Sequence, residues 1–135
     1  MKVTRFEELE IWTDARELYK EVFLLTSKEP FCNDFRFRDQ IRAASGSVSD
    51  NIAEGFERGG NKEFIQFLSF AKGSCGEVRS QVYRSFDSKY IDSQEYHKLI
   101  ERTEYLSRKI SSLINYIKSS SLKGSKYSPP LKPTL

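Results

Sequence analysis

The fold is decided within residues 51–78, NIAEGFERGGNKEFIQFLSFAKGSCGEV, where two helical patterns meet at Gly59, Gly60 and Asn61. Glycine suits a tight turn because it has no Cβ. The side-chain oxygen of Asn61 can accept a hydrogen bond from a first-turn amide, which predicts that Asn61 is the N-cap of the second helix. The stretch therefore predicts two antiparallel helices joined by a short turn.

Both helices carry apolar residues at helical spacing, the first over residues 34–57 and the second from residue 61 to about residue 89. Their apolar stripes are Phe37, Ile41, Ala44, Val48 and Ile52, then Phe64, Phe67, Leu68, Ala71, Cys75, Val78, Val82 and Phe86. Gly46 and Gly55 interrupt the first helix, and Gly73 and Gly76 interrupt the second. A glycine inside a helix costs on the order of 1 kcal/mol relative to alanine. We therefore expect a neighbouring helix to approach these positions closely.

Two further helical patterns flank this pair. Residues 4–7, TRFE, match a T-x-x-E capping box, and Pro30 ends the helix that follows. Asp92 and Glu95 form a D-x-x-E start for a last helix that runs to about residue 117. The two stripes are Leu9, Trp12, Ala15, Tyr19, Val22 and Thr26, then Tyr96, Leu99, Thr103, Leu106, Ile110, Leu113 and Ile117. No stretch alternates as a strand would, so we predict an all-α, antiparallel up-down-up-down four-helix bundle.

The chain of 135 residues is long enough for one domain with an apolar core. We expect the bundle to occupy residues 1–118 and residues 119–135, SSSLKGSKYSPPLKPTL, to form a flexible basic tail. The first residues lack a signal-peptide pattern and no apolar run is long enough for a bilayer, which predicts a cytoplasmic protein without a membrane partner. The two cysteines are too few for a disulfide framework.

Basic side chains gather towards the carboxyl end, although the net charge is only +3. No acidic residue follows Glu104, whereas these basic residues do: Arg108, Lys109, Lys118, Lys123, Lys126 and Lys132. Such a region attracts phosphates or acidic partners. A solvated basic surface and tail would explain the same residues without any partner.

Six basic side chains are candidates for nucleic-acid binding: Arg38, Arg42, Lys72, Arg79, Arg108 and Lys109. Arg38 and Arg42 share one flank of the helix over residues 34–57. Lys72 and Arg79 share one flank of the next helix, and Tyr83 points in a similar direction. Cations neutralise phosphates and an aromatic ring can stack on an unpaired base, so this arrangement suits RNA.

Enzymatic chemistry has no constellation in its favour. His97 is the single histidine, and its spacing from Glu95 does not match the Glu-x-x-His motif of di-metal bundles. Cys75 falls on a core stripe, where a free cysteine usually packs as a small hydrophobe. We therefore predict no catalytic residue, no metal site and no cofactor.

Four polar residues bracket the central turn: Asn51, Glu54, Arg58 and Glu63. Carboxylates beside an arginine can form an active site. At a helical corner they more often form a hydrogen-bonded lock, since a buried charge must be paired to be tolerated. We predict a structural polar lock.

Segments spread over residues 6–117 resemble a known bacterial family. They are FEELEIWTDARELYKEVF near the amino terminus, then QIRAA, SVSDNIAEG, Arg58, EFIQFL and AKGSCGEV. The chain resembles the four-helix-bundle proteins encoded in intervening sequences of bacterial large-subunit rRNA genes. Gly46, where the family more often has a larger residue, and residues 119–135 depart from its pattern.

The resemblance implies a four-helix bundle that assembles into a ring, often a pentamer. It extends to the accessory variability proteins of diversity-generating retroelements, which form basic pentameric barrels that bind nucleic acid and a reverse transcriptase. Two functions follow as expectations: a non-enzymatic homopentamer that binds RNA, or an oligomeric scaffold for a partner enzyme such as a reverse transcriptase. The scaffold is motivated by aromatic residues off the main stripes: Phe23, Phe35, Phe56 and Phe70.

Overall fold

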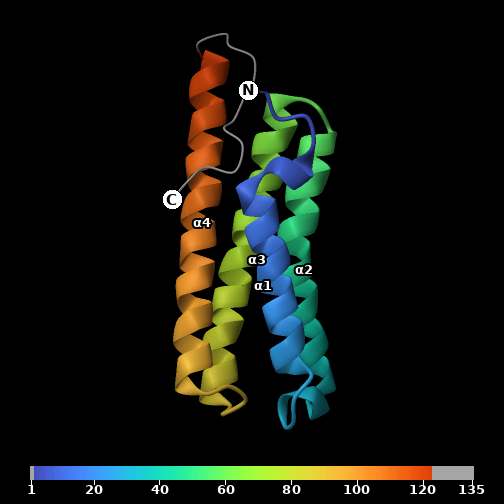
Figure 1. The fold of residues 1–135 in the computed structure, drawn as a ribbon, viewed down its shortest axis with the longest axis vertical. Coiled ribbons are helices and arrows are strands. Elements are labelled where there is room, and N and C mark those ends of the chain that lie inside the picture. The colour runs from blue at the N-terminus through green and yellow to red at the C-terminus, as the bar shows by residue number, and fades with distance from the viewer. Residues whose placement is uncertain (1, 123–135) are drawn as a thin grey trace.

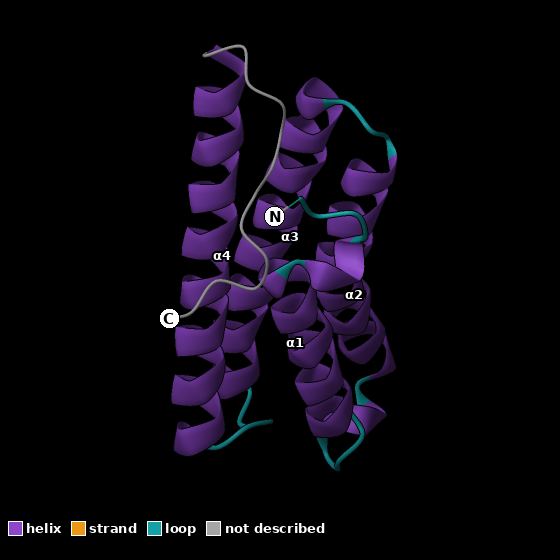
Figure 2. Cartoon of the chain, turned by 45° about the horizontal axis from the view of Figure 1, so that its top comes forward, coloured by secondary structure: helices purple, strands orange, loops and turns teal. Residues whose placement is uncertain are grey.

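The structure is a computed structural model that describes residues 2–122. Its elements are the α-helices α1 (Glu10–Thr26), α2 (Phe35–Glu57), α3 (Asn61–Asp87) and α4 (Ser93–Leu122), with short 3-10 helices η1 (Phe6–Glu8) and η2 (Phe31–Asn33). The four α-helices run alternately up and down as one bundle (Figure 1). Figure 2 shows only helices and loops in the described part of the chain. The predicted all-α four-helix bundle is confirmed.

The core runs along the bundle axis and is mostly aliphatic, with Phe31, Phe37 and Phe64 as its aromatic members. Its largest fully buried aliphatic side chains include Leu18, Ile52, Leu68, Leu106, Ile110 and Ile117. Each α-helix packs on its neighbour in sequence, and α1 also packs on α4. This last contact is the smallest of the four helix pairs, and charged side chains close it: Glu10 pairs with Lys109 at 3.3 Å and Glu21 with Lys98 at 2.9 Å.

The predicted capping box over residues 4–7 is wrong. Glu8, not Glu7, accepts hydrogen bonds from the backbone amides of Thr4 (2.9 Å) and Arg5 (3.2 Å). A tight 3-10 turn follows, and the buried Leu9 then takes an extended conformation, so that α1 begins only at Glu10. The buried stripe of α1 differs accordingly and consists of Ile11, Ala15, Leu18, Val22 and Thr26.

The turn between α2 and α3 is confirmed at Gly59, whose φ of 84° lies in the left-handed region that favours glycine. The predicted N-cap is wrong by one residue, because Gly60 is the N-cap and Asn61 is already helical. Two members of the predicted α3 stripe also leave the core: Phe67 is half-buried and Phe86 is exposed.

The predicted starts of α2 and α4 are confirmed by their caps. The Asp34 side chain accepts a hydrogen bond from the Phe37 amide at 3.3 Å. Asp92 and Glu95 bond reciprocally, each backbone amide donating to the other carboxylate at 2.8 Å. Helix α4 continues to Leu122, past the expected boundary at residue 118, because serines are tolerated in a last helical turn. The rest of the predicted tail, residues 123–135, lies outside the described residues.

Candidate nucleic-acid interface

Lys72, Arg79 and Tyr83 lie on the α3 flank that faces α4. Steps of seven and four residues return to the same side of a helix within about 40°. Arg79 Nη1 lies 3.2 Å from the Glu104 carboxylate of α4, which fixes the position of this flank beside α4. Lys72 is exposed and has no ion pair within residues 2–122.

Arg108 lies near the same surface, which we call the α3–α4 face and define by Lys72, Arg79, Tyr83 and Arg108. Because α3 and α4 are antiparallel, moving from Arg79 towards Lys72 corresponds to moving from Glu104 towards Arg108. Arg108 is about 6 Å further along α4 than Glu104, and Lys72 about 10 Å further along α3 than Arg79. Within residues 2–122 the α3–α4 face therefore carries two cations without an ion pair, Lys72 and Arg108, and one paired cation, Arg79.

Arg38 and Arg42 lie near the start of α2, a helix that does not pack on α4, and are engaged within the chain. Arg42 donates from Nε to Thr26 Oγ1 at 2.8 Å and from Nη2 to Ser27 Oγ at 3.1 Å, so that it tethers the end of α1 to α2. Arg38 pairs with Asp39 at 2.9 Å and donates to the Cys32 carbonyl at 3.3 Å. The structure does not bring either arginine to the α3–α4 face.

Lys109, next to Arg108 in sequence, points the other way. Its Nζ lies 3.3 Å from Glu10 Oε1, and the exposed fractions of the two side chains are only 22% and 16%. A lysine that is already paired with a carboxylate in the α1–α4 contact contributes little to phosphate binding. The geometry assigns Lys109 to bundle closure.

An aromatic cluster, Tyr83, Phe86, Tyr96 and His97, closes the lower end of the α3–α4 face. The Phe86 ring stacks on Tyr96 with centroids 4.4 Å apart, and the Tyr83 ring meets Tyr96 edge-on at 5.6 Å. Desolvation raises the pKa of Tyr96, and the neighbouring Tyr83 and Asp87 raise it further. Helical spacing placed Phe86 and Tyr96 in core stripes. No signal in the sequence separated these two residues from the core, because both lie at the helical spacing of their stripes.

The residues of the predicted polar lock do not gather into one cluster. Arg58 Nη2 pairs with Glu54 Oε2 at 2.7 Å, one helical turn apart on an exposed surface. Asn51 instead donates to the Ser47 carbonyl of its own helix at 2.8 Å. Glu63 folds back over the α3 N-cap, with its carboxylate against Gly60.

The glycines within α2 and α3 differ in how closely a neighbouring helix approaches them. At Gly55 an added Cβ would lie 2.6 Å from Phe67 Cβ, so α3 approaches here as closely as predicted. At Gly46 an added Cβ would lie 3.7 Å from the Tyr19 ring, which is an ordinary van der Waals contact. The predicted close approach is wrong for Gly73 and Gly76, because an added Cβ there would meet no atom within 4 Å.

The two side chains considered for catalysis, Cys75 and His97, lie in different parts of the bundle, within α3 and near the start of α4. Burial raises the pKa of the Cys75 thiol to about 11, and the thiol donates to the Thr103 carbonyl at 3.2 Å. A thiol in this state is protonated at neutral pH and is a poor nucleophile. His97 lies at the exposed start of α4. Residues 2–122 contain no group of three His, Cys, Asp or Glu side chains that could hold a metal, and none of their helices could span a membrane.

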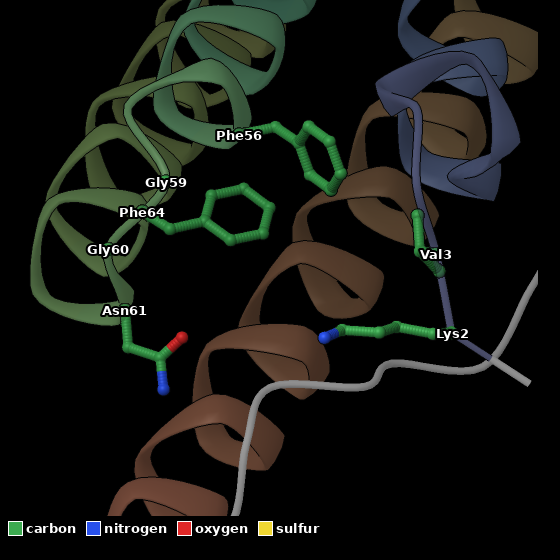
Figure 3. Close-up of a pocket in the computed structure, with 7 residues that line it drawn as sticks. All are labelled: Lys2, Val3, Phe56, Gly59, Gly60, Asn61 and Phe64. Atoms are coloured by element: carbon green, nitrogen blue, oxygen red, sulfur yellow. The ribbon is translucent and has the colours of Figure 1, made fainter.

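A hollow of about 550 Å³ separates the amino-terminal segment from the α2–α3 turn (Figure 3). It is lined by Lys2, Val3, Phe56, Gly59, Gly60, Asn61 and Phe64. The rings of Phe56 and Phe64 meet edge-on at 5.8 Å, so Phe56 is engaged within the chain. Among the described residues that line it, Lys2 is the one titratable side chain, so these residues offer no acid–base pair.

Comparison with known proteins decides the family. The family model described as 23S rRNA-intervening sequence protein matches residues 7–112. The chain belongs to this family. The chain also resembles a crystal structure from Bacteroides thetaiotaomicron, described as a protein with unknown function from the S23 ribosomal protein family. The TM-score is 0.70 at 18% identity, over 77% of this chain and 97% of that one, which supports the fold alone. No curated protein matches the sequence.

Proposed function

We propose that this member of the 23S rRNA-intervening sequence protein family is a non-enzymatic RNA-binding protein whose interface is the α3–α4 face. The observation that carries the proposal is the pair of exposed cations, Lys72 and Arg108, on neighbouring helices with no ion pair in residues 2–122. Helix α4 carries no acidic residue between Glu104 and Leu122, so its charged side chains over this part are basic, although Arg108 itself lines a hollow with Asp14, Glu101 and Glu104. Phosphate neutralisation supplies most non-specific nucleic-acid affinity.

The site is narrower than the six residues that the sequence suggested. Arg38, Arg42 and Lys109 are held by hydrogen bonds or ion pairs elsewhere in the bundle. Arg79 remains available, because its ion pair with Glu104 is exposed on both sides and such pairs exchange readily with other anions. The expected binding surface is therefore one face of two helices.

The test is the affinity for a labelled RNA across a series of salt concentrations. The variant Lys72→Gln/Arg108→Gln should bind roughly 10-fold more weakly at low salt, and its salt dependence should fall by roughly one contact per residue. Lys20→Gln/Arg36→Gln, which removes the same charge from exposed positions of α1 and α2, is the matched control. Equal losses in both variants would show that only net charge matters, and affinity independent of salt would contradict the proposal.

Self-association is a second candidate function, and it would allow the protein to act as a scaffold. Large apolar side chains are exposed on the surface, including Leu24 at 65%, Phe35 at 63% and Phe70 at 49%. Apolar side chains exposed in a monomer are candidates for burial between copies. The ring predicted from family resemblance, and a reverse transcriptase as partner enzyme, belong to this candidate.

Light scattering tests this candidate through the molar mass. A ring should give a multiple of the 15.7 kDa chain at micromolar concentration, and a pentamer would give five times that mass. Phe35→Ser and Phe70→Ser should shift the mass towards that of one chain if these side chains are buried between copies. A single chain in the unaltered protein would contradict both the ring and the scaffold.

A further inference from the structure

The aromatic cluster of Tyr83, Phe86, Tyr96 and His97 has no role in the core of the chain. The exposed fractions of Tyr83 and Phe86 are 47% and 39%, although each directly follows a buried residue of α3, Val82 and Ser85. Tyr96 of α4 lies behind them and contacts both rings. The inner side of each exposed ring is therefore packed, whereas a large part of each outer side faces solvent.

This packing prepares the two rings for a planar ligand. A free aromatic side chain loses rotamer freedom when it binds, which weakens binding. Phe86 is already held by stacking at 4.4 Å with an angle of 24° between ring planes, and Tyr83 by an edge contact at 70°. His97 adds an edge contact to Tyr96 at 5.1 Å. Little further ordering is needed to stack one more ring on the outer side.

The cluster continues the flank that carries the cations. From Lys72 the steps of seven, four and three residues lead to Arg79, Tyr83 and Phe86, which stay within about 60° of one another around α3. A strand that places phosphates at Lys72 and Arg79 would thus bring its next bases to the rings. Nucleic-acid surfaces that bind single strands combine cations and aromatic rings in this way.

The charges at the cluster itself favour a base over a phosphate. Asp87 is close enough to Tyr96 to raise the pKa of that phenol, so its carboxylate would repel an approaching phosphate. On the flank of α3 that carries the rings the cations are Lys72 and Arg79, whereas Arg84 turns towards α2, where it lies over the Phe37 ring and donates to Gln40. A base is uncharged and can occupy the aromatic end, while the phosphates stay beside the cations.

We propose that the Tyr83–Phe86 surface, ordered from behind by Tyr96, stacks on an unpaired base of single-stranded RNA. The inference rests on the proposed function and names its ligand class. In a duplex the faces of interior bases are covered by stacking and cannot reach a protein ring, so only unpaired segments offer this contact. Duplex RNA would use the phosphate contacts alone.

The experiment compares a labelled single-stranded RNA 12-mer with a duplex of the same length, by fluorescence anisotropy at low salt. Tyr83→Leu and Phe86→Leu remove the aromatic ring but keep an apolar side chain, and circular dichroism checks that the fold is retained. Each variant should bind the single strand about 5- to 10-fold more weakly and leave duplex affinity unchanged, as expected for one lost base stack. Tyr83→Phe should bind within about two-fold of the original protein because the ring remains.

Tyr116→Leu is the matched control, because Tyr116 is 39% exposed on α4 outside the cluster. If the single strand binds but Tyr83→Leu and Phe86→Leu leave its affinity unchanged, the stacking proposal is overturned while the phosphate interface stands. If neither RNA binds at low salt, both proposals fail together. If the two leucine variants change the molar mass and not RNA affinity, the cluster is a contact between copies and the stacking proposal is also overturned.

Discussion

Replacing Gly55 with valine should destabilise the bundle by about 3 kcal/mol, because overpacking a tight helix crossing typically costs 1–3 kcal/mol and valine adds two methyl groups beyond its Cβ. That Cβ would lie 2.6 Å from Phe67 Cβ and 3.2 Å from Phe64 Cδ1. The first contact involves an atom next to the backbone, so α2 and α3 would have to separate. The measurement is the urea midpoint of unfolding, which should fall with little change in slope.

Gly73→Ala and Gly76→Ala are the matched controls for Gly55→Val. Both glycines lie within α3, and an added Cβ meets no atom within 4 Å. Alanine should therefore stabilise α3 by up to about 1 kcal/mol at each position through helix propensity. We expect Gly55→Val to lower the urea midpoint of unfolding and the two alanine substitutions to raise it. A Gly55→Val midpoint equal to that of the original protein would show that the α2–α3 crossing is wider than described.

Replacing Lys109 with methionine should destabilise the chain by about 1 to 3 kcal/mol, because removal of one partner leaves a carboxylate poorly solvated. The orphaned group is Glu10, whose side chain is 16% exposed in the α1–α4 contact. The expected loss stays below the 3–5 kcal/mol of a fully buried pair since some water remains. Thermal unfolding followed by circular dichroism measures the effect.

A double-mutant cycle isolates the contribution of the Glu10–Lys109 pair. Glu10→Gln/Lys109→Met removes both charges and should recover most of the stability lost in the single Lys109 variant. Lys20→Met is the matched control, because Lys20 pairs with Glu17 on an exposed surface and such pairs contribute about 0–1 kcal/mol. If Lys109→Met is as stable as Lys20→Met, Lys109 does not help to close the bundle.

Local sequence rules predicted the helices well wherever a cap or a turn residue acts alone. Asp34 caps α2, and Asp92 with Glu95 caps α4, as their spacing indicated. They were predictable because a capping side chain bonds to amides within three residues. The start of α1 was not, because the buried Leu9 and the 3-10 turn before it depend on packing against the bundle.

Periodicity also predicted which side of each helix is apolar, but not where the core ends. Phe86 lies on the predicted stripe of α3, yet 39% of it is exposed, because it lies at the edge of that stripe and packs on Tyr96 of α4 with one side of its ring. A helical wheel gives a direction around one helix. It does not say whether another helix is present in that direction.

The sequence by itself therefore determined the helical class, three of the four helix beginnings to within one residue, and the basic character of the second half of α4. Only the tertiary structure decided which cations remain available. Adjacent in sequence, Arg108 is exposed whereas Lys109 closes on Glu10. The physical reason is that a charge becomes paired or free according to what the opposing helix places within about 4 Å of it, and that distance is fixed by helix packing rather than by local sequence.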